Sequence, residues 1–132
     1  MKFALKKIAM YKIAVIAHDG KKAEMVQFLM NHFSALKQNN IALIATGTTG
    51  KHAQNAGLEV ECLLSGPLGG DAQIAAQVAE GKIDMVFFFR DPMDRHPHEP
   101  DIQMLMRICD VHNVPLATNP ATATSLMKSL GT

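Results

Sequence analysis

The sequence predicts an α/β fold, a three-layer α/β/α sandwich around a five-stranded, mostly parallel sheet, in one domain over residues 1–132. Short apolar runs alternate along the chain with segments whose apolar residues recur at helical spacing. The runs are nearly continuous, which is typical of strands that helices cover on both faces. Right-handed crossovers between such units place a parallel sheet between two helical layers.

Five apolar runs mark the expected strands, at residues 12–17, 41–45, 60–64, 85–89 and 114–117. Two intervening segments have one apolar face each, which we expect to be core: Met25, Phe28, Leu29 and Phe33 in the first, and Ile102, Leu105, Met106 and Cys109 in the second. Further helices are expected at about 48–56, 71–80 and 121–129, with glycines at 57 and 81 ending two of them.

The composition excludes several classes of partner. A chain of 132 residues that is 48% hydrophobic and 19% charged is ordinary for a globular domain with one core. Its formal net charge of +1 provides no general attraction for nucleic acid or membrane. With no Trp and one Tyr, it also lacks a stacking platform for single-stranded nucleic acid. We therefore expect neither nucleic acid nor membrane as a partner.

The cysteines and the N-terminal segment favour a cytoplasmic protein. Cys62 and Cys109 stand in apolar stretches, and we predict buried free thiols rather than a disulfide or a metal pair. Lysines at positions 2, 6 and 7 precede the apolar residues 8–10, but Lys12 interrupts this run and no small-residue cleavage pattern follows. We therefore predict no signal peptide and no membrane span.

Polar segments follow four of the expected strands, at residues 18–22, 46–50, 65–71 and 90–101. In open parallel sheets, ligands bind beyond the carboxyl ends of the strands, near the point where the strand order reverses. The four loops should therefore converge on one edge of the sheet and form a single site.

Two of these loops consist mainly of small residues, TGTTG at 46–50 and SGPLGG at 65–70. Small residues let backbone N–H groups approach an anion, and a helix N-terminus favours negative charge. Each loop by itself is explained as well or better as a strand-to-helix turn, the first with a threonine cap. Together they favour a site for a phosphate monoester. Neither has the spacing of a P-loop or of a dinucleotide-binding loop.

Asp71 directly follows the second of these loops, where a helix is expected to begin. Aspartate is a favoured helix N-cap, and spacing alone favours that role. A carboxylate beside an anion site opposes anion binding, however, and is explained if it removes a proton from a bound phosphorylated substrate. Both roles stay open at this point.

The two remaining loops carry titratable groups. His18 and Asp19 precede Lys21 and Lys22, where Asp19 is either a helix cap or a group facing the ligand, and the lysines are either a solvated face or a phosphate contact. The loop 90–101 holds two histidines, three aspartates and three prolines. Such histidines either bind a divalent metal or act as acid and base without one, and the His-x-His spacing is weak evidence for metal.

Together and in this order, these segments resemble methylglyoxal synthase. The matching stretches are VIAHDGKK, ALIATGTTG, LLSGPLGGDAQIAAQVAEGKIDMVFFFRDPMD, HPHEPD and VPLATNPATA. The resemblance implies the methylglyoxal synthase-like fold and the conversion of dihydroxyacetone phosphate to methylglyoxal and inorganic phosphate, without metal or organic cofactor. It also implies a homohexamer that phosphate inhibits cooperatively. Regulatory and transferase relatives typically lack the aspartate after the glycine-rich loop and the histidine–aspartate loop, and this chain keeps both.

The resemblance also implies roles for individual residues. Asp71 would be the general base, and His98 and Asp101 would handle protons at the substrate oxygens, with Asp101 able to orient the His98 ring. His18, Asp19 and Asp91 would also lie in the site. Substrate and phosphate contacts would come from His18, Lys22, Thr46, Gly47, Thr48, Thr49, Ser65, Gly66 and His98.

Two alternatives stay open. A non-catalytic, phosphate-sensing regulatory domain of the same fold would bind anions without turnover. A metal-dependent phosphohydrolase that uses His96, His98 and Asp91 would lose its activity with a chelator.

Overall fold

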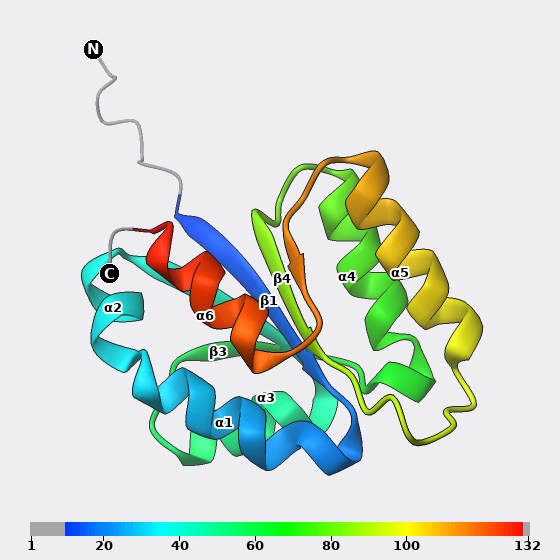
Figure 1. The fold of residues 1–132 in the computed structure, drawn as a ribbon, viewed down its shortest axis with the longest axis horizontal. Helices are drawn as coiled ribbons and strands as arrows, with labels where there is room; N and C mark the ends of the chain where they lie inside the picture. Colours follow the sequence, from blue (N-terminus) through cyan, green and yellow to red (C-terminus); the bar gives the residue numbers. More distant parts are fainter. Residues whose placement is uncertain (1–9, 131–132) are drawn as a thin grey trace.

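The computed structural model describes residues 10–130 and shows strands alternating with helices (Figure 1). The strands are β1 (Tyr11–Ala17), β2 (Ile41–Thr46), β3 (Val60–Leu63), β4 (Met85–Phe89) and β5 (Leu116–Ala117). The helices are α1 (Lys22–Asn31), α2 (Phe33–Gln38), α3 (Gly47–Asn55), α4 (Gly70–Ala79), α5 (Glu99–Val111) and α6 (Pro120–Lys128). Two short 3₁₀ turns precede α1 and α4, η1 (Asp19–Lys21) and η2 (Gly66–Leu68).

The five strands form one parallel sheet in the order β3-β2-β1-β4-β5. β1 is central: Ile13 lies opposite Leu43 of β2 on one side and opposite Met85 of β4 on the other. The chain runs outward from β1 to β3 and returns through α4 to β4, so the strand order reverses between β1 and β4. Open parallel sheets bind ligands at such a reversal.

Helices cover both faces of the sheet, which confirms the predicted three-layer α/β/α sandwich. Successive strand residues point to opposite faces. Val15 and Phe87 pack in a cluster with side chains of α1, α2, α3 and α6. Their neighbours Ile16 and Phe88 pack on the other face with side chains of α4 and α5.

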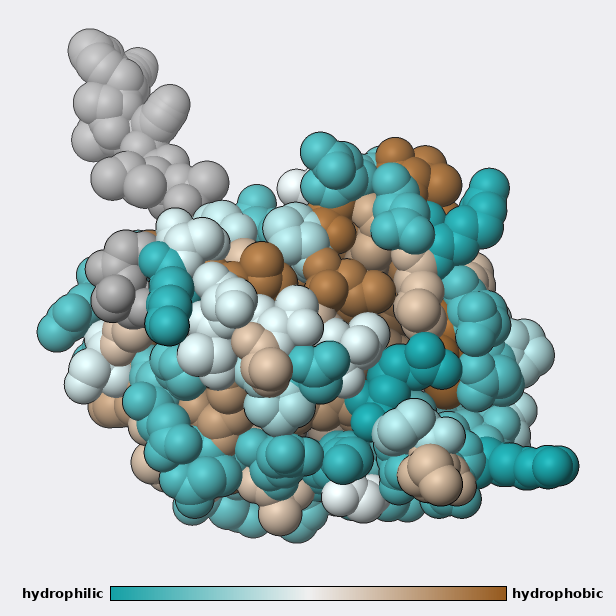
Figure 2. Space-filling model, in the orientation of Figure 1, coloured by the Kyte–Doolittle hydropathy of each residue, from teal (hydrophilic) through white to brown (hydrophobic). Residues whose placement is uncertain are grey.

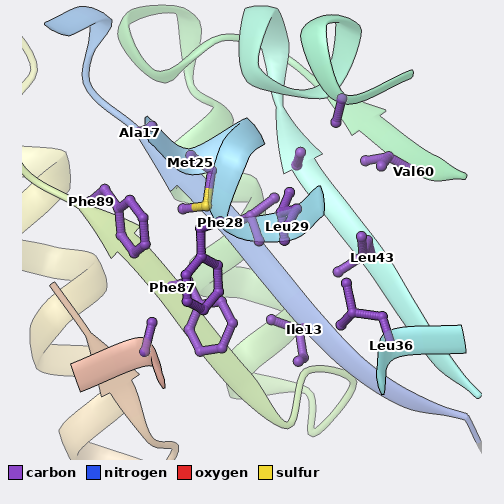
Figure 3. Close-up of a cluster of buried hydrophobic side chains, with 14 of the residues drawn as sticks. Ile13, Ala17, Met25, Phe28, Leu29, Leu36, Leu43, Val60, Phe87 and Phe89 are labelled. Carbon is purple, nitrogen blue, oxygen red and sulfur yellow. The ribbon is translucent and has the colours of Figure 1, made fainter. Parts of the chain in front are cut away.

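The first of these clusters anchors α1 to the sheet through three phenylalanine rings (Figure 3). Phe28 of α1 lies edge-on against Phe87 and Phe89 of β4, with ring centroids 5.5 Å apart in both pairs. Met25 and Leu29 flank Phe28 on the same helix and are fully buried. Since burial of each such side chain contributes about 1.5–3 kcal/mol, this packing also fixes the loop that joins β1 to α1.

Phe33 does not belong to this apolar face, contrary to the sequence prediction. α1 ends at Asn31, and His32, with φ −109° and ψ 17°, leaves helical geometry before Phe33 begins α2. Nδ1 of His32 lies 3.0 Å from the carbonyl oxygen of Phe28, a contact that supports the break. The helical register is lost there, and Phe33 is 38% exposed.

The prediction of two buried thiols is wrong for Cys62 and right for Cys109, and both are free. Cys62 lies on β3, which stands at the edge of the sheet next to β2. Both Glu61 and Cys62 are exposed on this edge strand, although Sγ of Cys62 lies next to Gly50 of α3. Burial raises the pKa of the Cys109 thiol to about 11, so this group stays protonated at neutral pH.

The surface in the view of Figure 2 is mainly hydrophilic, and the more hydrophobic residues gather between α6 and α5. Within residues 10–130, no helix is both long enough and apolar enough to cross a membrane. The lysines and apolar residues on which the signal-peptide prediction rested lie, up to residue 9, outside the described residues.

Candidate active site

A cavity of about 420 Å³ opens at the carboxyl edge of the sheet, beside the reversal between β1 and β4. All four polar loops contribute to its wall. The predicted site residues that line it are His18, Asp19, Lys22, Thr46, Thr48, Ser65, Gly66, Asp71 and His98. The fold thus brings together side chains from the ends of four different strands.

Asp71 is fully buried in the wall of this cavity, in the first turn of α4. It is not the helix N-cap, because Gly69 occupies that position. Neither carboxylate oxygen has a hydrogen-bond partner among the described residues. A carboxylate without donors is less stabilised in its charged form than a capping carboxylate, and is therefore the stronger base. The position in the first turn of α4 favours its negative charge.

Two glycines permit the close packing around Asp71. A Cβ on Gly66 would lie 2.9 Å from Nε2 of His98 and 3.3 Å from Oδ1 of Asp71. A Cβ on Gly70 would lie 2.0 Å from the carbonyl oxygen of Leu64. Gly66 therefore leaves room for His98 and Asp71 to face each other, and Gly70 lets α4 begin directly against the end of β3.

His98 reaches Asp71 from the loop after β4. Nε2 of His98 lies 3.5 Å from Oδ2 of Asp71, which allows an ion pair when the imidazole is protonated. Nδ1 of His98 is buried without a hydrogen-bond partner in the described part of the chain. Asp101 was expected to orient this ring. Instead it lies in the first turn of α5, where its backbone N–H donates to the carbonyl oxygen of His98 at 3.0 Å.

The surroundings of Asp71 raise the pKa of its carboxyl above the ordinary value of 3.8. Burial is the main cause, His98 acts in the opposite direction, and Asp101 adds to the rise. Such a carboxylate takes up a proton more readily than an exposed aspartate. This property suits a general base near neutral pH.

His18 is held in one tautomer by the backbone. The N–H of Asp91 donates to Nδ1 of His18 at 2.9 Å, so in the neutral ring the proton is on Nε2. Nε2 is buried and has no hydrogen-bond partner within residues 10–130. Burial, followed by His96, His98 and Arg90, lowers the pKa of His18 to about 4, against a smaller opposing effect of Glu99. At neutral pH, His18 is therefore an uncharged N–H donor in the cavity wall.

The cation at the first loop is Lys22, which lines the cavity, and not Lys21. Nζ of Lys22 donates to Oδ1 of Asp19, and this interaction lowers the pKa of the Asp19 carboxyl. Lys21 instead pairs with Glu24 at 3.7 Å. Asp19 does not cap α1, whose N-cap position is Lys21.

Four predicted site residues do not line the cavity: Gly47, Thr49, Asp91 and Asp101. A Cβ on Gly47 would lie 2.6 Å from Cα of Ser65, so this glycine seats one small-residue loop against the other. Thr49 is fully buried in α3. Oδ1 of Asp91 accepts the backbone N–H two residues further along, at 3.1 Å, which folds the loop after β4. Gly47, Thr49 and Asp91 thus contribute to the packing and the folding of the loops around the cavity.

Four further residues of the loop after β4 line the cavity, Asp94, Arg95, His96 and Pro97. Asp94 and Arg95 had no predicted role, and His96 was predicted either to bind a metal or to act as an acid or base without one. The only feature of the sequence that pointed to these residues was their position in a polar loop at the end of a strand. Which side chains of such a loop turn inward depends on its individual turns, and these do not follow from spacing.

Within the described residues, no group of three or more His, Cys, Asp or Glu side chains is arranged to hold a metal ion. The metal-dependent alternative built on His96, His98 and Asp91 therefore has no ready ligand set in this part of the chain. The expectation of a site that works without a cofactor stays a prediction.

The sequence and the fold have clear counterparts among known proteins. Residues 28–118 match the family model of the MGS-like domain. A protein named methylglyoxal synthase from Ralstonia nicotianae is 55% identical, over 91% of this chain and 88% of the relative. Proteins of the same name from Carboxydothermus hydrogenoformans and Thermus thermophilus are 52% and 56% identical, over 92% and 89% of this chain and 99% and 93% of theirs.

The crystal structure of methylglyoxal synthase from Elizabethkingia anophelis superimposes with a TM-score of 0.83 at 42% sequence identity, covering 90% of this chain and 78% of that one. The described fold is thus that of an MGS-like domain. Sequence identity above 50% over most of the chain assigns it to one family within this class. The chain belongs to the methylglyoxal synthase family, and its relatives indicate that it is a lyase.

Proposed function

We propose that this chain converts dihydroxyacetone phosphate to methylglyoxal and inorganic phosphate through an enediolate. The observation that carries the proposal is the buried carboxylate of Asp71, which has no hydrogen-bond partner among the described residues and lies in a cavity lined by N–H and hydroxyl donors. Membership of the methylglyoxal synthase family supports the same reaction.

The phosphate of the substrate would bind between the two small-residue loops. Thr46, Thr48 and Ser65 bring hydroxyl groups to the cavity wall, and Lys22 brings a positive charge. α3 begins at Gly47 in the same region, and a helix N-terminus favours an anion. With the phosphate bound there, the carbonyl group and the hydroxymethyl carbon of the substrate would point toward Asp71.

Asp71 would then remove a proton from the hydroxymethyl carbon. A proton beside a ketone is too weakly acidic for a carboxylate to remove unless donors stabilise the oxygen on which negative charge develops. The Nε2–H of His18 is an uncharged donor without a partner in the described residues, and Nε2 of His98 is the second candidate. The C–H electron pair forms a C–C double bond, and the π electron pair of the carbonyl moves to its oxygen, which yields the enediolate.

In the second step the enediolate expels phosphate. The enediolate loses its hydroxyl proton as the aldehyde carbonyl forms, its C–C double-bond electrons form a new double bond to the phosphate-bearing carbon, and the C–O bond to the phosphate breaks. The phosphate takes up a proton and leaves as the dianion, and the remaining enolate takes up a proton at the former phosphate-bearing carbon to give methylglyoxal. Lys22 would stabilise the leaving dianion. The breaking C–O bond must stand perpendicular to the enediolate plane, so the loops that hold the phosphate would set a torsion that the reaction requires.

We further propose the cytoplasmic, homohexameric state and the inhibition by phosphate that the family resemblance implies. Inorganic phosphate has the same charge and shape as the bound phosphoryl group, so it would compete for Lys22 and the hydroxyl groups. Sedimentation of the full chain with and without phosphate would test the oligomeric state, and initial rates over a phosphate series would test the inhibition.

The proposed function is tested by incubating the full chain with dihydroxyacetone phosphate and a chelator, and measuring methylglyoxal and phosphate separately. We expect the two products in equal amounts. Phosphate without methylglyoxal would identify a hydrolase, and phosphate binding without either product would identify a sensing domain. Asp71→Asn serves as the matched control for non-enzymatic breakdown of the substrate.

A further inference from the structure

A third histidine lies in the cavity wall and packs on the ring of His18. The rings of His96 and His18 are stacked, with centroids 3.5 Å apart and an angle of 20° between their planes. Phe88 meets the His18 ring edge-on at 5.2 Å, and His98 meets it edge-on at 6.0 Å. Of these three neighbours, only His96 lies nearly parallel to the His18 ring and stacks on it.

This stacking has a consequence for the tautomer of His18. The backbone N–H of Asp91 requires an unprotonated Nδ1, so the bond is kept only while the His18 ring is neutral and correctly tilted. The stacked ring of His96 opposes tilting and excludes water from that face. Nε2 of His18 is left as the protonated nitrogen and has no hydrogen-bond partner in residues 10–130.

The charged and titratable groups around His18 mostly disfavour a second proton. The loop after β4 contributes His96, His98 and Arg90, whose positive charges oppose protonation of His18. Glu99, at the start of α5, favours it, but Nη2 of Arg90 lies 3.5 Å from this carboxylate. Asp19 follows His18 directly and is paired with Lys22. Burial and the neighbouring imidazoles therefore both lower the pKa of His18.

We propose that His96 is a positioning residue, whose stacked ring holds His18 as a neutral Nε2–H donor toward the oxygen of a bound substrate. The inference rests on the proposed function only for the identity of that substrate. His96 acts through His18 and need not touch the reacting atoms. Specifically, the aromatic ring of His96, rather than its charge, is the required feature, since the ring covers the face of His18 in either protonation state.

The test is the tautomer and titration of His18, followed by long-range ¹H–¹⁵N NMR of the histidine rings in the full chain between pH 4.5 and 8. In the unmodified protein, the neutral Nε2–H tautomer of His18 should predominate throughout this range, because the pKa of His18 is about 4. His96→Phe keeps a stacked ring and should give the same result. His96→Ala and His96→Gln remove the ring, and in both His18 should titrate at a midpoint raised by about one pH unit or more.

Kinetics provide the second readout. We expect kcat to fall about tenfold or more in His96→Ala and His96→Gln, and to be largely kept in His96→Phe. His112→Ala is the matched control, because His112 is exposed at the far end of α5, about 20 Å along the helix from the cavity. It should leave the His18 signals unchanged.

An unchanged His18 tautomer and titration in both His96→Ala and His96→Gln would overturn the proposal. So would a shift in His96→Phe as large as in His96→Ala, because the imidazole and not the stacked ring would then be required. The NMR measurement needs no turnover, so it separates failure of this inference from failure of the proposed reaction.

Discussion

Oδ2 of Asp71 and Nε2 of His98 face each other at 3.5 Å across the space that Gly66 leaves free. The two residues come from the beginnings of α4 and α5, which follow different strands and meet at one edge of the sheet. The contact places a buried carboxylate beside a group that can be charged or neutral. The contact is therefore an ion pair when the imidazole is protonated.

Gly66→Ala should remove activity while the fold remains. The new Cβ would lie 2.9 Å from Nε2 of His98, so the imidazole or Asp71 must move. Displacement of a catalytic group by about 1 Å costs on the order of a hundredfold in rate. Steady-state kinetics and circular dichroism would measure the two effects.

The control for this substitution is Gly81→Ala. Gly81 has φ +77° and nothing within 4 Å of an added Cβ, so the variant carries backbone strain without touching the cavity. We expect it to lose about 1 kcal/mol of unfolding free energy and to keep its kcat. A Gly66→Ala enzyme with normal kcat would show that the spacing of Asp71 and His98 is not required.

Lys22→Ala should weaken the binding of substrate and of inorganic phosphate about tenfold or more, because a charge-assisted contact to phosphate is lost. Lys21→Ala removes the same charge one residue away, but Lys21 pairs with Glu24 and does not line the cavity. It should bind phosphate normally. Calorimetry with phosphate distinguishes the two, and equal losses in both variants would indicate general electrostatic attraction instead of a specific contact.

The pH dependence of kcat should show an acid limb that belongs to Asp71. Its carboxyl must be ionised to accept a proton, and burial raises its pKa above 3.8, so activity is lost as the pH falls through this raised value. His18, with a pKa of about 4, stays neutral over most of that range and keeps its N–H donor. An acid limb that is unchanged in the residual activity of Asp71→Asn would assign it to another group.

The unfolding free energy should respond very differently to two phenylalanine substitutions. Phe87 is fully buried and packs against Phe28, so Phe87→Ala should cost about 3–5 kcal/mol. Phe33 is 38% exposed, and Phe33→Ala should cost about 1 kcal/mol or less. Urea unfolding measures both. Equal costs would place Phe33 in the core, as its helical spacing had suggested.

The sheet was predictable from the sequence because its strands are buried on both faces and appear as continuous apolar runs. Boundaries of β1, β2, β3 and β4 agree with the prediction to within one residue. The two places where the prediction was wrong have local causes. β3 lies at the edge, so Cys62 is exposed, and His32 interrupts a helical pattern that no glycine or proline marks.

The location of the site was predictable from the sequence, but which side chains face the cavity was predictable only in part. Loops that follow parallel strands must meet at one edge, which is why residues from four loops line one cavity. Which side chains of a loop turn inward depends on turns that local sequence does not reveal. Asp91 therefore supports the loop from behind, whereas Arg95 and His96 face the cavity.

The central claim is that Asp71 takes the proton from carbon, and proton abstraction in deuterium oxide tests it most directly. The quantity to measure is the sum of two rates, deuterium entering the remaining substrate and methylglyoxal forming, for the unmodified chain and for Asp71→Asn. The asparagine keeps the shape of the side chain but not its basicity. We predict that the folded variant still binds phosphate and loses on the order of a hundredfold or more of this summed rate. A folded Asp71→Asn protein that abstracts the proton at the normal rate would contradict the account and place the base elsewhere in the cavity.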